Sequence, residues 1–307
     1  MQILVLGAGA MGSLLGARLA HTDASVTLFT IDREHVEAVQ KDGLLIEEMD
    51  ETVSHHRLPA IDSADSISDT PDLVLVTVKS YATETAVQSV MPFCHASTVF
   101  LTLQNGTGNW QQIARIAGRG AVVAGTTAQG ATLVGPGRVR HGGRGATFLG
   151  EPEGQPTDRV TALVNRFRQS GLHTESSDNM EWLIWEKLMV NVGINAITAL
   201  TGIRNGLVAD LQPARQLSRA AVREAMEVAK AAGFPMPAGM EEKVLSIARA
   251  TARNRSSMGQ DVDARKRTEI DSINGAIVRL GKELQIQTPI NLTLTNLVRI
   301  VEAGLGS

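Results

Sequence analysis

Cysteine is nearly absent from this sequence, since Cys94 is the only one among 307 residues. A single cysteine permits no intrachain disulfide and cannot supply a thiolate metal cluster from one chain. An excess of charge is also missing, because 29 basic residues stand against 32 acidic ones and the formal net charge is -3. The sequence therefore lacks the basic footprint of a nucleic-acid-binding protein. We expect no nucleic-acid partner.

Signals for export and for membrane insertion are missing as well. The chain enters an apolar stretch at Gln2 to Leu6 without a basic leader, and no stretch reaches the apolar length needed to span a bilayer. With a single cysteine, this predicts a cytoplasmic protein without a membrane partner. His55 and His56 lie in a polar segment without a suitably spaced third ligand, so we expect them to be solvated and expect no metal site. The oligomeric state is left open, with a homodimer as one possibility.

What the sequence does contain is two regions of different periodicity. Up to residue 178, short apolar runs alternate with helical stretches, which predicts a Rossmann-type doubly wound parallel sheet. Short segments at Arg138 to Arg140 and Ala146 to Leu149 predict antiparallel strands appended at the edge of that sheet. From residue 179 to 307 helical periodicity dominates. The fold class is therefore α/β, with a Rossmann-type domain (1–178) followed by an all-helical C-terminal domain (179–307).

The helices predicted for the second region have clear apolar faces and stop signals between them. They span Glu181 to Leu200, Pro213 to Ala232, Met240 to Ala252, Gln260 to Leu284 and Asn291 to Glu302.

A glycine-rich turn directly follows the first predicted strand and opens a helix. Gly7, Gly9 and Gly12 match the G-x-G-x-x-G pattern in the context that a dinucleotide fingerprint requires. The first glycine permits the tight turn, the second lets the backbone approach a pyrophosphate, and the third allows close helix packing. We expect the cofactor to contact the whole stretch, namely Gly7, Ala8, Gly9, Ala10, Met11 and Gly12.

The end of the second strand bears on the choice between NAD and NADP. An acidic residue there binds the ribose hydroxyls of NAD, but this chain has Thr30. Arg33 and Lys79 are cations that could reach the 2′-phosphate of NADP. Asp32 is either a displaced ribose ligand or a helix-capping carboxylate. The pattern favours NADPH as the cofactor and leaves NAD open.

One predicted helix carries a polar stripe among apolar residues. Lys187, Asn191 and Asn195 recur every fourth residue between Glu181 and Leu200, which places them on one face. A lysine in such a helix predicts a cleft, where desolvation would lower the pKa of the ammonium toward useful proton-donor chemistry. The amides could bind carboxylate or hydroxyl oxygens. The alternative is an ordinary solvated edge.

Four further polar residues have a structural interpretation. Glu269 is expected to lie on a helical face that points to the core or a cleft, or else in a salt bridge on a wet surface. Ser257 stands shortly before a predicted helix, which it can cap. Asn105 and Asn205, each followed by glycine, are typical turn residues.

Taken together, these motifs resemble the ketopantoate reductase (2-dehydropantoate 2-reductase) family over nearly the whole chain. The segments that carry the resemblance are Gly7 to Gly12, Thr77 to Ser80, Gln104 to Gly106, Trp185 to Asn191 with Asn195, Ser256 to Asp261 and Thr268 to Gly275. Two departures are visible: Ala196 stands where the family usually has proline, and Ile31 stands where many members place arginine.

The resemblance implies a Rossmann domain followed by a helical domain with the active site in the cleft between them. It implies that Lys187 donates a proton to the ketone and that Glu269 lies where nicotinamide and substrate meet. The residues implied to hold substrate are Asn105, Asn191, Asn195, Asn205 and Ser257. Those implied to approach the cofactor, besides the glycine turn and Glu269, are Asn105, Lys79 and Ala131, with Arg33 as a substitute for the missing arginine.

The activity implied is NADPH-dependent reduction of 2-dehydropantoate to pantoate, in pantothenate and coenzyme A synthesis. One alternative is a paralogous reductase of another branched or hydroxylated 2-oxo acid, because fold does not determine specificity. The other is a non-catalytic NADPH-binding regulator. Lys187 and Glu269 argue against the regulator, since a sensor has no need of a proton donor.

Overall fold

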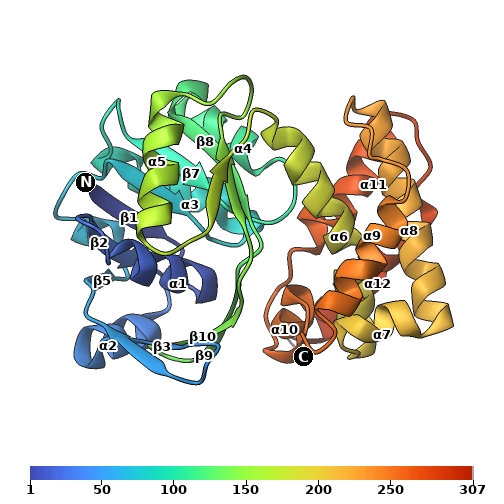
Figure 1. Cartoon of the computed structure of the whole chain (residues 1–307), viewed down its shortest axis with the longest axis horizontal. Coiled ribbons are helices and arrows are strands. Elements are labelled where there is room, and N and C mark those ends of the chain that lie inside the picture. Colours follow the sequence, from blue (N-terminus) through green and yellow to red (C-terminus); the bar gives the residue numbers. More distant parts are fainter. Residues whose placement is uncertain (306–307) are drawn as a thin grey trace. The chain divides into compact units, whose positions relative to one another are not determined.

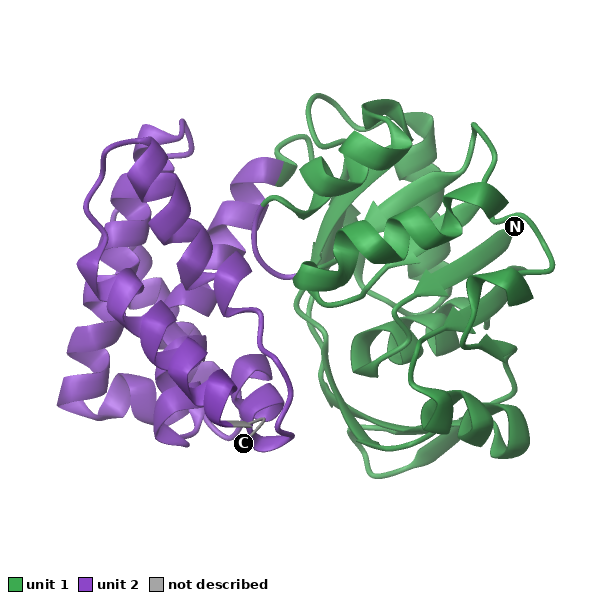
Figure 2. Ribbon diagram, turned by 180° about the vertical axis from the view of Figure 1, so that it is seen from behind, with its two compact units in different colours: residues 1–104, 108–180 green, residues 105–107, 181–307 purple. Residues whose placement is uncertain are grey.

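The computed structural model describes residues 1–305 and divides into two compact units (Figures 1 and 2). Unit 1 comprises residues 1–104 and 108–180, and unit 2 comprises residues 105–107 and 181–307. The main division therefore falls after Met180, close to the predicted domain boundary after residue 178. The sequence carried no sign that the short segment 105–107 groups with the second unit.

Unit 1 is built on an eight-stranded sheet. Across the sheet the strands are β12 (Thr174–Ser176), β11 (Thr147–Gly150), β8 (Val122–Thr127), β7 (Val99–Thr102), β6 (Leu73–Val76), β1 (Gln2–Leu6), β2 (Ser25–Phe29) and β5 (Ala60–Ile61). The six strands from β8 to β5 are parallel, whereas β11 is antiparallel to β8. The strand order reverses direction between β1 and β6, which confirms the predicted doubly wound sheet and places its switch point beside the glycine turn.

Five α-helices belong to the described part of unit 1: α1 (Ala10–Leu19), α2 (Arg33–Asp42), α3 (Thr83–Val90), α4 (Asn109–Ala117) and α5 (Asp158–Gln169). Short 3-10 turns are η1 (Ala64–Ser66), η2 (Ser80–Ala82), η3 (Met91–Phe93) and η4 (Arg119–Ala121). The central strands are buried over their whole length, as in β6, where all four residues are apolar and inaccessible. Strands covered on both faces by helices read as continuous apolar runs for this reason.

A second, four-stranded sheet corrects one expectation from the sequence. Its order is β4 (Val53–His56), β3 (Leu44–Glu47), β10 (Arg138–Gly143) and β9 (Gly130–Gly135). The predicted strand at Arg138 to Arg140 therefore does not extend the edge of the main sheet, since it pairs with β3 and β9. Only the segment from Ala146 onward, as β11, joins that edge. The physical reason is burial, because the second sheet packs its apolar face against α1, which lies between the two sheets.

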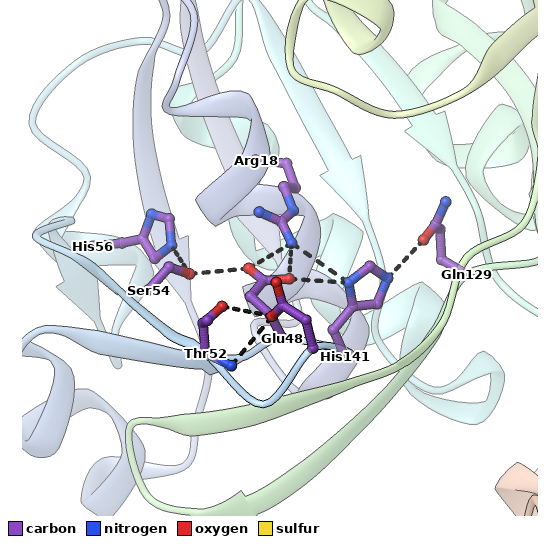
Figure 3. A network of polar contacts seen from close by, with 8 residues as sticks. Arg18, Glu48, Thr52, Ser54, His56, Gln129 and His141 are labelled. Atoms are coloured by element: carbon purple, nitrogen blue, oxygen red, sulfur yellow. Dashed lines mark hydrogen bonds and ion pairs between the residues drawn. The ribbon is translucent and has the colours of Figure 1, made fainter.

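A polar network ties α1 to this second sheet (Figure 3). Arg18 on α1 donates to both carboxylate oxygens of Glu48, at 2.7 and 2.5 Å. His141 on β10 approaches the same carboxylate with Nδ1 at 3.3 Å, and its Nε2 lies 3.0 Å from the side-chain oxygen of Gln129. The Arg18 guanidinium and these hydrogen bonds hold the pKa of the Glu48 carboxyl below its usual value despite the opposing effect of burial.

The histidine pair on β4 is not the solvated pair that the sequence predicts. His55 is exposed, but His56 is only 7% exposed. The ring of His56 stacks on His21 and its Nε2 lies 2.9 Å from the hydroxyl of Ser54. Burial, with a smaller contribution from His21, lowers the pKa of His56 to about 4. Alternation along β4 turns one histidine of the pair inward, which a polar stretch of sequence conceals.

Unit 2 is helical. Its elements are α6 (Met180–Thr201), α7 (Asn205–Asp210), α8 (Gln212–Ala231), α9 (Met240–Ala250), α10 (Ser257–Asp263), η5 (Ile270–Ser272), α11 (Asn274–Glu283) and α12 (Pro289–Leu305). The single helix predicted from Gln260 to Leu284 is wrong, because the chain leaves α10 at Asp263 and forms η5 before α11 begins. Arg265 adopts a φ of +54°, which a right-handed helix cannot accommodate.

Helix α6 is the centre of unit 2. It is long and apolar enough to cross a membrane by length and composition, with a mean hydropathy of 1.2, although the sequence suggested no such stretch. Most of its apolar residues instead join one core cluster with residues of the other helices, including Trp185, Met189 and Val192. A helix that is apolar around most of its circumference is expected at the centre of a helical domain.

Candidate active site

The glycine turn lies at the carboxyl end of β1, next to the switch point of the main sheet. Gly7 has a φ of +105°, and a Cβ atom there would lie 2.4 Å from the backbone nitrogen of Val78. A Cβ atom on Gly12 would lie 2.4 Å from the carbonyl oxygen of Gly7. Both glycines are thus required by the packing of unit 1 itself, as the tight turn and the close helix packing predict.

Gly9 differs from its two neighbours in the motif. Apart from adjacent residues, no heavy atom of the described chain lies within 4 Å of the position that its Cβ would occupy. Packing therefore does not explain a glycine here, but a ligand that approaches the backbone would. Gly9 precedes the first residue of α1, whose first turn carries no acidic side chain. An open space at a helix N-terminus fits the pyrophosphate of a dinucleotide.

Two charged residues after β2 interact with other residues of unit 1. Asp32 caps α2, because its side chain accepts a hydrogen bond from the His35 amide at 3.2 Å. Arg33 is highly exposed, and its guanidinium lies 3.3 Å from the carboxylate of Asp62. Ile31, also exposed, stands between Thr30 and Asp32. The capping interpretation of Asp32 therefore holds, and Arg33 is an accessible cation with an acidic neighbour.

Three more predicted cofactor residues lie on different elements. Lys79 is partly buried and follows β6, so it lies at the same edge of the sheet as the glycine turn. Ala131 is partly buried on β9, opposite His141. Asn105 belongs to the segment that groups with unit 2, where the Cβ position of Gly106 would lie 2.3 Å from the carbonyl oxygen of Ser272. Asn105 is thus a turn residue before a glycine of positive φ, and it is this glycine that lies against η5.

The polar stripe of α6 is not a solvated edge. Lys187 and Asn191 are half-buried and Asn195 is only 5% exposed. Burial lowers the pKa of Lys187 to about 8, and the Glu269 carboxylate opposes this by favouring the charged form. A primary amine with such a pKa remains largely protonated at neutral pH and releases its proton readily.

The two asparagines of the stripe carry unsatisfied donors. Within residues 1–305, the side-chain nitrogens of Asn191 and Asn195 are buried and have no hydrogen-bond partner. A buried donor without a partner costs about 1–3 kcal/mol, so natural proteins rarely retain one without a purpose. Both amides are free to bind an oxygen atom of a ligand beside the Lys187 ammonium.

Glu269 is buried, but not on the helix that the sequence predicts. It precedes η5 and is 6% exposed, so the alternative of a salt bridge on a wet surface is wrong. The nearby Arg267 lies 3.4 Å from the carboxylate of Asp271. The sequence interpretation of Glu269 as buried is thus correct for a different local reason, since a 3-10 turn and not an amphipathic face orients it.

The serine that caps α10 is Ser256 and not Ser257. Ser256 accepts a hydrogen bond from the Gly259 amide at 3.0 Å, and its hydroxyl lies 2.6 Å from that of Thr198 on α6. Ser257, the first residue of α10, is exposed. Sequence reasoning missed Ser256, because either serine of the pair could cap a helix. Ser257 consequently has a hydroxyl that the cap does not use.

Asn205 opens α7 and is 8% exposed. Its side-chain nitrogen donates to the hydroxyl of Thr251 at 3.1 Å. Its side-chain oxygen is buried, and no hydrogen-bond partner for it is found in the described chain. Asn205 is therefore a partly satisfied polar residue of unit 2.

Comparison with known proteins bears on both units. Residues 3–154 match the family model described as Ketopantoate reductase PanE/ApbA, and residues 179–302 match the model of its C-terminal part. A 2-dehydropantoate 2-reductase of Halobacterium salinarum is 37% identical over 98% of this chain and 99% of its own length. One from Pyrococcus horikoshii is 36% identical over 100% of both chains.

The chain belongs to the ketopantoate reductase family. Among solved structures, a ketopantoate reductase of Ralstonia eutropha is similar over 100% of both chains, with a TM-score of 0.92 and 32% identity. A D-mandelate dehydrogenase, solved with NADH and anilino(oxo)acetate, is similar over the same extent with a TM-score of 0.92 and 28% identity. The family resemblance inferred from the separate motifs is confirmed.

One of the two departures from the ketopantoate reductase pattern has a structural context. Ala196, where proline is usual, lies in the middle of α6 and is fully buried. An alanine keeps the backbone hydrogen bond that a proline would remove, and α6 runs unbroken through this position from Met180 to Thr201. The departure changes the stiffness of the helix and leaves Lys187, Asn191 and Asn195 on one face.

Proposed function

We propose that this protein is an NADPH-dependent oxidoreductase that reduces 2-dehydropantoate to pantoate, a step of pantothenate and coenzyme A synthesis. The observation that carries the proposal is Lys187, an amine whose pKa burial lowers to about 8 beside two unsatisfied amides. Full-length relatives named 2-dehydropantoate 2-reductase support the choice of substrate.

In this proposal the catalytic residues are Lys187 and Glu269. When bound, a reduced nicotinamide supplies the hydride for the carbonyl carbon. Lys187 donates its proton to the carbonyl oxygen as negative charge develops there. Glu269 acts on Lys187 by raising its pKa, which keeps the amine protonated until the substrate is in place.

Substrate binding is assigned to neutral side chains. Asn191 and Asn195 donate from their unsatisfied nitrogens to substrate oxygens, which gains the hydrogen bonds that the free protein lacks. The exposed hydroxyl of Ser257 and the amides of Asn105 and Asn205 complete the proposed set. Neutral donors suit a 2-oxo acid because they orient it without competing with Lys187 for a proton.

Cofactor binding is assigned chiefly to unit 1. The open position at Gly9 supports binding of the pyrophosphate at the glycine turn, Gly7 to Gly12. Arg33 and Lys79 would hold the 2′-phosphate, while Ala131, Asn105 and Glu269 would approach the rest of the cofactor. NADPH is thus the expected cofactor, although the Arg33–Asp62 ion pair and the NADH-bound structural neighbour leave NAD open. The proposed dinucleotide-binding and catalytic domains, 1–178 and 179–307, follow this division of roles.

Initial rates with a panel of 2-oxo acids test the substrate. We expect the highest kcat/KM with 2-dehydropantoate, compared with pyruvate, 2-oxoisovalerate and phenylglyoxylate. Turnover of 2-dehydropantoate no better than that of the simple 2-oxo acids would contradict the proposal. Phenylglyoxylate is included because a neighbour of equal structural similarity is named D-mandelate dehydrogenase, which favours a paralogous 2-oxo acid reductase as the second candidate.

Fluorescence titration with NADPH and NADH, side by side, tests the cofactor. We expect NADPH to bind more tightly, and equal affinities would contradict the preference. A third candidate, a regulator that binds NADPH without turnover, would show binding but no reduction with any 2-oxo acid. We further propose a cytoplasmic location, no membrane or nucleic-acid partner, and a homodimer that sedimentation would detect.

A further inference from the structure

Unit 1 contains a buried histidine, His35, that no part of the proposed mechanism uses. His35 lies on α2, is 1% exposed, and contacts two other segments of unit 1. Its Nδ1 accepts a hydrogen bond from the backbone amide of Gly137 at 3.1 Å. Its Nε2 lies 3.1 Å from the hydroxyl of Ser13 on α1. The imidazole therefore bridges the turn between β9 and β10 to the helix that follows the glycine motif.

The direction of each hydrogen bond follows from the donors available. A backbone N–H only donates, so Nδ1 of His35 carries no proton. Burial lowers the pKa of His35, with Asp32 opposing, and a neutral ring must then carry its proton on Nε2. Nε2 consequently donates to the Ser13 hydroxyl. The orientation of Gly137 thus fixes the tautomer of His35.

The Ser13 hydroxyl connects His35 to the glycine motif by a second hydrogen bond. Its oxygen lies 3.1 Å from the carbonyl oxygen of Ala8 and donates to it. The Ser13 oxygen already accepts a hydrogen bond from Nε2 of His35, so its own proton cannot point toward the ring. The hydroxyl therefore donates to the carbonyl oxygen of Ala8. Ser13 is fully buried and Ala8 is 1% exposed, so water does not compete for these bonds.

The hydrogen bond from Ser13 to Ala8 fixes one side of the peptide group between Ala8 and Gly9. The carbonyl of the Ala8–Gly9 peptide accepts from Ser13, and the Gly9 amide on its other side donates to the carbonyl oxygen of Gly7 at 2.7 Å. Both polar groups of this peptide plane are therefore fixed. Gly9 is the position left open for a pyrophosphate, so the plane next to the ligand is set before the ligand arrives.

We propose that His35 and Ser13 are positioning residues that orient the Ala8–Gly9 peptide for NADPH, with the Gly135–Pro136–Gly137 turn fixing the tautomer of His35. The glycine of that turn serves this arrangement. Gly137 has a φ of +67°, and its Cβ position would lie 3.0 Å from the Cβ of Ala38 on α2. A side chain at Gly137 would therefore move its amide away from His35. The proposal rests on the proposed binding of NADPH and adds no new reacting group.

The hydrogen bonds from Gly137 through His35 and Ser13 to Ala8 form a relay, which paired substitutions test by fluorescence titration with NADPH. Ser13→Ala removes the bond to Ala8, and we expect the Kd for NADPH to rise about five- to tenfold, the worth of one buried hydrogen bond. His35→Gln places an amide nitrogen near the position of Nε2, so it keeps the donation to Ser13. His35→Asn places an oxygen near Nδ1 and keeps only the bond to Gly137. We expect His35→Gln to bind within about twofold of wild type and His35→Asn to lose affinity like Ser13→Ala.

Thr98→Val is the matched control. The hydroxyl of Thr98 is buried in the same unit and donates to the carbonyl of Pro71 at 2.7 Å, remote in sequence from the glycine motif. This variant should lower Tm to an extent similar to Ser13→Ala and leave the Kd for NADPH unchanged. A merely structural role of Ser13 would give both variants the same Kd, and that result would overturn the proposal.

Two further readouts separate the positioning role from the proposed activity. A long-range ¹H–¹⁵N spectrum of the histidine-labelled free protein should show His35 as the neutral Nε2–H tautomer, and an Nδ1–H tautomer would overturn the relay. In turnover assays the KM for NADPH should rise in Ser13→Ala while kcat stays near wild type. If wild type binds neither NADPH nor NADH, the proposed function fails. If wild type binds NADPH and Ser13→Ala binds it equally well, only the positioning role fails.

Discussion

The glycine turn of unit 1 and the polar stripe of α6 in unit 2 satisfy their polar groups to opposite degrees. In the glycine turn the amides of Gly7, Ala8 and Gly9 are hydrogen-bonded within the unit. On α6, the side-chain nitrogens of Asn191 and Asn195 have no partner among the described residues. The amides of the turn are therefore used within unit 1, and what the turn offers a ligand is the open position at Gly9. The stripe of α6 instead keeps unsatisfied donors that a ligand can use.

The largest expected effect comes from removing the amine of the stripe. Lys187→Ala should lower kcat for 2-oxo acid reduction at least about a hundredfold, the usual scale for a general acid, while NADPH binding stays near wild type. Steady-state rates and NADPH titration measure the two effects. Lys243→Ala is the control. Lys243, on α9, is exposed and its ammonium lies 2.6 Å from the carboxylate of Glu186, the residue that precedes Lys187 in the sequence. A loss of only a few-fold in Lys187→Ala would remove the proton-donor role.

Two alanine substitutions in the glycine turn separate its role in cofactor binding from its role in packing. Gly9→Ala should leave Tm near wild type, because its Cβ position is open, but raise the Kd for NADPH about tenfold or more through lost phosphate contacts. Gly12→Ala should lower stability by about 1–3 kcal/mol, because its Cβ would overlap the Gly7 carbonyl. Thermal melts and NADPH titration compare them. Equal loss of stability in both variants would mean that the site at Gly9 is not open.

Because the side-chain nitrogens of Asn191 and Asn195 have no partner, removing one of these amides should raise the free energy of unfolding or leave it unchanged. Asn195→Ala should raise the KM for the 2-oxo acid about tenfold without lowering Tm, since it deletes a buried donor that lacks a partner. Asn274→Ala is its counterpart, because Asn274 donates to Asn291 at 3.0 Å and to the Val192 carbonyl at 3.3 Å. This variant should lower Tm with little effect on KM. The reverse pattern would contradict the distinction between the two asparagines.

The smallest effect concerns the pH profile. Reduction needs protonated Lys187, so its rate should fall as the pH rises through about 8. Glu269→Gln removes the charge that raises the pKa of Lys187, and the alkaline limb should move to lower pH. Asp271→Asn, in η5, alters an exposed carboxylate two positions further and should leave the limb in place. A limb that does not move in Glu269→Gln would exclude this coupling.

Much of the fold and of the candidate site follows from short-range patterns. Strand–glycine–helix order at residues 3–20 predicts the dinucleotide turn, and spacing by four predicts that Lys187, Asn191 and Asn195 share a face, because both depend on local backbone geometry. The failures have a common cause. Arg138 to Gly143 pairs with Leu44 to Glu47 rather than with the main sheet, and a left-handed Arg265 ends the helix expected to carry Glu269. Neither the pairing nor the break has a local signal.

The sequence alone thus determined the two classes of architecture, the glycine turn and the residues of the polar stripe, because periodicity and glycine spacing are properties of neighbouring residues. Only the tertiary structure decided the protonation chemistry. The pKa of Lys187 depends on burial and on Glu269, and the tautomer of His35 depends on the amide of Gly137, 102 positions away. Desolvation and hydrogen-bond direction are set by atoms that the chain brings together on folding.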